Sequence, residues 1–339
     1  MNRRLLLGFF SALGILVLIL DTKTALSGAA EGIALCIGSV IPSLFPFLVL
    51  SILLTSALTG LHSKPLSRLA SLCGIPKGSE AILLTGLLGG YPVGAQAAAQ
   101  SCRQGRITLH TARRMLGFCS NAGPAFLFGI VAGKFSVWWA AWVLWAIHIL
   151  SALLIGACLP GREQTSAVSG KPVPVSLPRA LEQSVRIMAL ICGWVIIFRV
   201  LISVLNRWLL WLFPIDLQVF LLGLLELTNG CCELEYIQNE GLRFVCASAI
   251  LGFGGLCVSM QTASVAEGLG TGWYIPGKIL QALISVILAS ACVFLLFPAS
   301  MRPRMLPVYP AFAALLLGIC IILLRKREKR SSNPALLGV

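Results

Sequence analysis

Long apolar blocks separated by short polar segments run through almost all of this 339-residue chain. A helix needs about 20 mostly apolar residues to cross the hydrocarbon core of a bilayer, and eight blocks approach or reach that length. They are residues 5–20, 41–58, 115–133, 137–159, 187–205, 244–265, 275–296 and 308–324. The pattern predicts an all-α polytopic membrane protein with about eight full spans.

Three further apolar segments differ from these blocks. Residues 24–40 hold Glu31 among several small residues, which predicts a short interfacial helix. Residues 81–99 and 218–234 are interrupted in the middle by the sequences GGYPVG and ELTNG. Gly and Pro interrupt regular structure, so each of these two segments predicts a re-entrant hairpin that enters and leaves the membrane on the same side.

The positions of the basic residues favour this topology. With a cytoplasmic N-terminus and non-crossing hairpins, the 26 Lys and Arg residues divide as 19 inside, six outside and Arg199 within a span. Cytoplasmic loops carry an excess of Lys and Arg. A full crossing by residues 81–99 would move the four arginines between positions 103 and 114 to the outside, against this bias. We therefore expect an integral cell-membrane protein with both termini in the cytoplasm.

The chain also shows weak internal similarity. The sequence GLLGGYPVGA at 86–95 aligns with GLLELTNGCC at 223–232, and Gly123 aligns with Gly255. Each unit contains three crossings, so the second copy would be inverted relative to the first, as in many secondary transporters. The predicted organisation is an N-terminal span and interfacial helix (1–40), a first repeat (41–160), a linker (161–184), a second repeat (185–298), and a C-terminal span with a basic tail (299–339).

Composition narrows the class of protein. Only 11% of the residues are charged and the mean hydropathy is +0.92, whereas soluble domains carry about 25% charged residues. The net charge of +14 does not indicate nucleic-acid binding, because the charges lie between apolar blocks and in the C-terminal tail. Scattered cysteines and histidines predict no metal site or cofactor, and enzyme motifs such as HExxH, GxSxG and Walker A are absent from the sequence. We therefore do not expect an enzyme.

Four breaks in apolar segments form the candidate site: residues 89–94, 120–124, 227–230 and 252–255. Irregular backbone at membrane depth must be buried in protein or line a wet cavity, and helix N-termini suit polar or anionic ligands. Alternatively, the glycines only allow helices to pack closely and the prolines only kink them. The polar side chains beside the breaks are Tyr91, Gln96, Ser120, Asn121, Glu226, Thr228, Asn229, Ser259 and Gln261.

Glu226 and Arg199 are charged residues well inside apolar blocks. A charge at the centre of a membrane helix costs at least about 2.5–3.5 kcal/mol, so such residues usually have a partner or a function. Glu226 either binds a coupling ion, a proton or sodium, or forms a structural pair with Arg199.

Four ordered motifs resemble those of a known family: IPSLFPFLVLS at 41–51, GGYPVGAQ at 89–96, CSNAGPAFLFGIVAG at 119–133 and GFGGLCVSMQTAS at 252–264. They are similar to the sporulation integral membrane protein YlbJ family, which is grouped with the nucleoside transporter/FeoB GTPase Gate domain (nucleoside recognition). The resemblance covers about residues 25–300. It implies passage of dipicolinate into the developing spore, and hence the forespore membrane. By motif, it implies functional positions at Gly90, Tyr91, Pro92, Gly94, Asn121, Gly123, Pro124, Gly254, Gly255 and Gln261.

The sequence therefore predicts a transporter of a small polar or anionic solute of the dipicolinate or nucleoside class, in contact with the lipid bilayer. The alternative is a non-transporting membrane scaffold for spore-envelope assembly. A solvent-accessible polar centre would favour transport, and a dry, filled centre would favour the scaffold. The sequence leaves the oligomeric state open.

Overall fold

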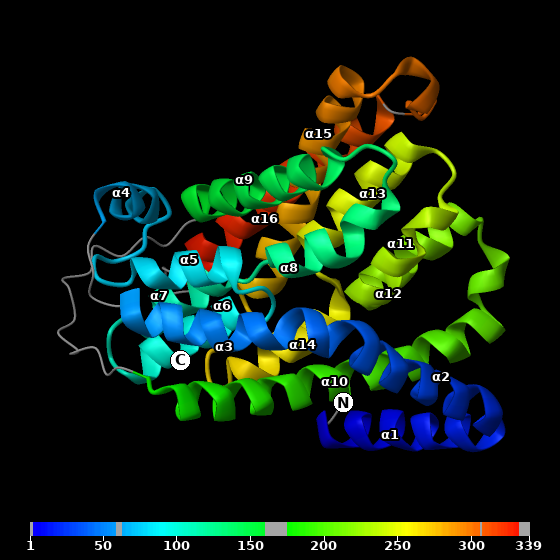
Figure 1. Cartoon of the computed structure of the whole chain (residues 1–339), viewed down its shortest axis with the longest axis horizontal. Helices are drawn as coiled ribbons and strands as arrows, with labels where there is room; N and C mark the ends of the chain where they lie inside the picture. Colours follow the sequence, from blue (N-terminus) through cyan, green and yellow to red (C-terminus); the bar gives the residue numbers. More distant parts are fainter. Residues whose placement is uncertain (1–2, 59–62, 160–174, 306, 332–339) are drawn as a thin grey trace.

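The computed structural model describes residues 3–58, 63–159, 175–305 and 307–331, and no strand is found within these ranges. Helices joined by turns and short irregular segments make up the fold (Figure 1). The helices are α1 (Arg3–Leu20), α2 (Thr22–Leu35), α3 (Ile41–Leu58), α4 (Lys64–Leu72), α5 (Glu80–Leu88), α6 (Val93–Arg103), α7 (Leu109–Leu116), α8 (Pro124–Phe126), α9 (Ala140–Cys158), α10 (Leu177–Trp208), α11 (Ile215–Leu225), α12 (Leu227–Cys232), α13 (Glu240–Phe253), α14 (Gly255–Val265), α15 (Tyr274–Leu296) and α16 (Val308–Ser331).

The segment predicted as a short interfacial helix is not a separate element, because it continues directly into the next helix. Helices α2 and α3 form one continuous helix, Thr22–Leu58, joined by a π-helical turn at Cys36–Val40. The turn lies directly before Pro42, whose ring would clash with a carbonyl of the preceding turn in a regular α-helix. The wider π turn lets the helix continue past this proline, through the boundary predicted at residue 40.

Helix α10 begins at Leu177, inside the predicted linker 161–184, because Ser176 and Pro178 are suited to a helix start. Residues 160–174 lie outside the described part of the chain. Helix α10 runs beside α2 and α3 across the lower part of Figure 1. Gly28 and Gly32 of α2 allow this close approach: a Cβ atom on Gly28 would lie 2.7 Å from Ser203 Oγ, and one on Gly32 3.0 Å from the Ile196 Cα.

Two pairs of short helices occupy the predicted hairpins. The first pair is α5 and α6, and the second is α11 and α12. None exceeds 11 residues, or about 17 Å, which is too short to cross a hydrocarbon core of about 30 Å. The second break is not at 227–230, as predicted, but at Glu226, where the backbone is extended. The Glu226 side chain caps α12, and the helix therefore resumes at Leu227.

The predicted span 115–133 is not one helix. Helix α7 ends at Leu116, and α8 begins only at Pro124, with irregular backbone between them. Helices α13 and α14 are separated at Gly254, which adopts a left-handed conformation with φ of 80°. A left-handed φ is easily adopted only by glycine, so the chain can change direction there.

Five helices within the described residues are long and apolar enough to cross a membrane: Thr22–Leu58, Ala140–Cys158, Leu177–Trp208, Glu240–Val265 and Tyr274–Leu296. Three of the eight predicted spans, at 5–20, 115–133 and 308–324, correspond to shorter apolar helices. Many exposed side chains are large and apolar, including Trp138 (81% exposed) and Leu295 (73%), as expected for a surface that faces lipid. The chain is thus a polytopic helical membrane protein. Eight full crossings and an inverted repeat stay predictions.

The topology can be tested with reporter fusions. Fusions after residues 110 and 170 are both expected to report a cytoplasmic location, because neither hairpin crosses the membrane in the predicted topology. Alkaline phosphatase and green fluorescent protein fusions at the same positions provide opposite readouts. An extracytoplasmic signal at either position would contradict the two-hairpin topology.

Candidate functional site

The first hairpin packs tightly against the first broken helix through glycine. A Cβ atom on Gly94 would overlap the carbonyl oxygen of Cys119 and lie 2.7 Å from Gly86 Cα on the other arm of the hairpin. A Cβ atom on Gly123 would lie 3.0 Å from Gly90 Cα. The irregular backbone before α8 therefore rests directly on the hairpin, so both predicted breaks are buried in protein.

The second hairpin is built in a similar way. A Cβ atom on Gly230 would overlap Gly223 Cα, so the two arms touch through glycine. Gly255 (φ 83°) packs against the hairpin, since its Cβ atom would lie 3.2 Å from both the Gly223 oxygen and the Leu227 nitrogen. Each broken helix therefore contacts one hairpin through backbone atoms.

A small cavity of about 30 Å³ lies where the two hairpins and the two broken helices meet. It brings together five of the predicted site residues: Tyr91, Gly123, Glu226, Thr228 and Gln261. The other residues around it are Val40, Leu44, Ala122, Phe126, Ile191, Val195, Leu227 and Val258. The cavity thus has an apolar wall and a few polar groups, the kind of lining that small-molecule sites have, in a much smaller volume.

Glu226 is buried beside this cavity (1% exposed). Its Oε2 accepts hydrogen bonds from the backbone and side-chain amides of Asn229, both at 2.7 Å. Arg199 does not pair with Glu226 directly. It donates to Asn229 Oδ1 at 2.6 Å and to Glu31 Oε2 at 2.5 Å. The chain of contacts therefore runs from the half-exposed Glu31 through Arg199 and Asn229 to Glu226.

Lys278 of α15 is a site residue that the sequence analysis missed. Its side chain is fully buried, and its Nζ donates to three neutral oxygens: Gln281 Oε1 at 2.7 Å, and Tyr91 Oη and Asn121 Oδ1 at 3.3 Å. Nζ also lies 5.0 Å from the centre of the Tyr91 ring. No ion pair of Lys278 is found in the described part of the chain. Its position inside the apolar block 275–296 is the sequence signal that indicates a buried lysine. The division of basic residues by side of the membrane hides this signal, because it assigns Lys278 to the inner side.

A buried polar network surrounds Lys278 and holds the first break. Gln281 donates to Asn121 Oδ1 at 3.0 Å and to the His148 oxygen at 3.2 Å. His148 Nε2 accepts the Ala122 amide at 2.9 Å. Asn121 in turn donates to the oxygens of Gly86 and Phe118. Asn121 thus positions the irregular backbone and does not line the cavity.

The remaining predicted residues lie around the cavity without lining it. Pro92 precedes α6, Pro124 opens α8, and Ser259 donates back to the Gly255 oxygen at 3.0 Å. Ser120 is buried, with no hydrogen-bond partner for its hydroxyl among the described residues. Gln96 points into a different cleft, between α3, α5 and α6.

Tyr91 lies between two buried ionisable side chains, Glu226 and Lys278. Its side chain lines the cavity with Glu226, and its hydroxyl contacts Lys278 and donates to the Leu251 oxygen at 3.2 Å. Among the described residues, no group of three or more His, Cys, Asp or Glu side chains is placed to hold a metal ion. The centre can therefore present hydrogen-bonding and charged groups to a polar solute.

The long apolar helices, the apolar surface and the buried polar centre define an integral helical membrane protein. Its sequence is similar to the sporulation integral membrane protein YlbJ of Bacillus subtilis (strain 168), with 25% identity over 311 residues, which cover 78% of this chain and 76% of that protein. This similarity supports the resemblance to the YlbJ family that the four motifs indicate. No family model matches the sequence. No solved structure is significantly similar to it.

Proposed function

We propose that this chain is a membrane transporter of a small polar or anionic solute, of the dipicolinate or nucleoside class, that acts in sporulation. One observation carries the proposal: the cavity lies where two short-helix hairpins and two broken helices meet, and a buried carboxylate lines it. Transporter sites typically lie at such junctions, where irregular backbone is tolerated because it lines a cavity. The sporulation role rests on the similarity to the Bacillus subtilis protein.

The order of elements supports an inverted repeat. A long helix, a hairpin, a broken helix and a second long helix follow one another twice. They are α3, α5–α6, α7–α8 and α9 in the first half, where the short helix α4 stands between α3 and the hairpin, and α10, α11–α12, α13–α14 and α15 in the second. In each hairpin a glycine of one arm packs on a glycine of the other: Gly94 on Gly86 in the first, and Gly230 on Gly223 in the second.

Glu226 is the proposed site of the coupling ion, a proton or sodium. It lines the cavity, and its bonded partners within the described residues are the two neutral amides of Asn229. An intramembrane carboxylate without a direct basic partner is costly, unless it binds a cation during the transport cycle.

The cavity is too small for the proposed solutes. A volume of about 30 Å³ holds about one water molecule, so this conformation is closed around the centre. Solute entry requires the hairpins to separate from the broken helices. The backbone contact between Gly90 and Gly123 is the interface that would open.

The same small volume favours a second candidate function. A scaffold for spore-envelope assembly needs a packed centre and no solute path, and most of the predicted residues here are packed against one another. Under this alternative Lys278 and its network only fix how α15 docks on the first hairpin.

Uptake into proteoliposomes tests the proposal. Purified protein should accumulate radiolabelled dipicolinate or a nucleoside when a proton or sodium gradient is imposed, and protein-free liposomes should not. Uptake of either solute would exclude a purely structural role. Failure to transport every solute of the panel, under both gradients, would favour the scaffold.

A further inference from the structure

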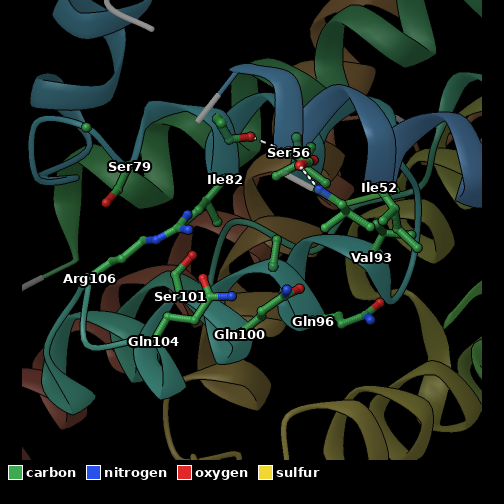
Figure 2. Close-up of a pocket in the computed structure, with 16 residues that line it drawn as sticks. Ile52, Ser56, Ser79, Ile82, Val93, Gln96, Gln100, Ser101, Gln104 and Arg106 are labelled. Atoms are coloured by element: carbon green, nitrogen blue, oxygen red, sulfur yellow. Dashed lines mark hydrogen bonds between the residues drawn. The ribbon is translucent and has the colours of Figure 1, made fainter. Parts of the chain in front are cut away.

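A second cleft of about 50 Å³ lies between α3, α5 and α6, apart from the central cavity. Gln96 and Gln100 of α6, with Gln104 at its end, face it at four-residue intervals and therefore lie on one side of the helix (Figure 2). In Figure 2 the amides of Gln100 and Gln104 point toward α3, while the Gln96 amide extends to one side and Arg106 reaches across the opposite end of the cleft. The other residues that line it are Ile52, Thr55, Ser56, Gly78, Ser79, Ala81, Ile82, Thr85, Val93, Ala97, Ser101 and Val175.

Two polar atoms in this cleft have no hydrogen-bond partner among the described residues. Arg106 Nε and Gln96 Oε1 are enclosed, yet neither makes a hydrogen bond to any described residue. More than 90% of buried polar groups in proteins are hydrogen-bonded, so these two atoms lack the partner that a buried polar group normally has. Here that partner is water or a solute that offers both acceptors and donors.

The charge of the cleft selects among solutes. Arg106 is the only ionisable residue among the described residues that line it. Burial lowers the pKa of the Arg106 guanidinium, but arginine starts from so high a value that it stays charged at neutral pH. The neighbouring carboxylate of Glu80 does not line the cleft; its oxygens accept hydrogen bonds from Ser67 Oγ and the Gly78 amide, both at 2.8 Å.

The tip of the first hairpin lies between the cleft and the central cavity. Val93 lines the cleft, while Tyr91, two residues earlier, lines the cavity beside Glu226. The end of the cleft at Val93 thus adjoins the turn between α5 and α6, whose Tyr91 lines the central cavity. Movement of that turn would connect the two spaces.

We infer that this cleft is an entry site that binds a carboxylate of a small anionic solute before the solute reaches the central cavity. Arg106 holds the carboxylate, because a guanidinium can donate two parallel hydrogen bonds to it. The amides of Gln96 and Gln100 bond the remaining polar atoms. This inference rests on the proposed transport function and adds a second site to it.

The test compares Arg106→Gln with a matched variant, Arg103→Gln, whose side chain lies on the exposed end of α6 and not in the cleft. Binding of pyridine-2,6-dicarboxylate to detergent-purified protein is measured by calorimetry, with uridine as an uncharged probe. Arg106→Gln should weaken dicarboxylate binding at least tenfold and leave uridine binding unchanged. Arg106→Lys should fall between the two, because an ammonium cannot donate in the same bidentate geometry. Arg103→Gln should match the wild type.

Equal binding by Arg106→Gln and wild type would overturn the inference, as would an equal loss in Arg103→Gln or no dicarboxylate binding at all. The calorimetry separates this inference from the transport proposal. Binding that depends on Arg106 in a protein that carries no solute would uphold the cleft and refute transport. Uptake by the wild type, with the same KM for uptake in Arg106→Gln, would uphold transport and overturn the cleft as an entry site.

Discussion

Replacing Lys278 with Met is expected to reduce solute uptake strongly without lowering the stability of the fold. The ammonium is fully buried, and its hydrogen-bond partners among the described residues are neutral oxygens; burying a charge costs several kcal/mol. Met has a similar length and removes that cost. The main loss is at Gln281 Oε1, which is left without its donor at a cost of about 1–3 kcal/mol. The two terms offset each other, so the melting temperature should be unchanged or higher.

Uptake should nevertheless fall by a factor of about 10 to 100. A hydrogen bond to a charged group contributes about 1.5–3 kcal/mol, and every 1.4 kcal/mol is a factor of ten. Initial uptake rates in proteoliposomes and thermal unfolding in detergent measure the two quantities separately. Lys134→Met is the matched control, since that lysine forms a partly exposed ion pair with Glu235 and does not line the central cavity, and its loss should change neither.

A marked drop in the melting temperature of Lys278→Met would instead assign Lys278 a structural role, as the scaffold alternative requires. Wild-type uptake by Lys278→Met would remove Lys278 from the transport mechanism.

Replacing Glu226 with Gln is expected to eliminate gradient-driven uptake and to preserve solute exchange across the membrane. The amide keeps an oxygen that can accept both hydrogen bonds from Asn229, so the cap of α12 and the fold should persist. The negative charge that would bind a coupling cation is lost. Uptake with and without an imposed gradient, compared with counterflow exchange, measures the effect. Uptake that still responds to the gradient would show that the ion binds elsewhere.

The same variant distinguishes coupling from a structural role of Glu226. If Glu226 balanced Arg199, then Glu226→Gln would lower the folded yield and a second change, Arg199→Gln, would restore it. Since Arg199 is already paired with Glu31, we expect no such rescue. Glu31→Gln is the control, because it leaves Arg199 without a carboxylate and should lower the melting temperature more than Glu226→Gln does.

Much of the fold could be predicted because lipid imposes strong rules on sequence. Long apolar runs marked the membrane helices, and glycine and proline marked the breaks near Gly90, Gly123 and Gly254. The second hairpin broke one residue earlier than predicted, because the Glu226 carboxylate caps the following helix, and capping depends on side-chain geometry that spacing alone does not reveal.

The candidate site was harder to predict than the fold. Hydropathy averages over a window, and a single lysine in the run 275–296 hardly changes that average, so Lys278 was not recognised as buried. The contact of Lys278 with Tyr91 joins residues 187 positions apart, and no local pattern encodes it. The eight crossings and the side on which each loop lies depend on a bilayer, and they therefore stay predictions.

The π-helical turn at Cys36–Val40 is the place in the long helix where one residue can be deleted without disturbing the packing on either side. Such a turn holds one residue more than the α-helix it interrupts, and that residue is absorbed locally. On one side of it, α2 packs on α10; on the other, Thr55 of α3 hydrogen-bonds Thr85 of the first hairpin. Losing one residue within the turn, in a chain that also lacks Pro42, would restore a regular helix and keep both packed faces aligned. Losing one residue elsewhere in α2 or α3 would rotate one end by about 100° relative to the other. Deletions among relatives of this chain should therefore gather at the turn and be rare along the rest of the helix.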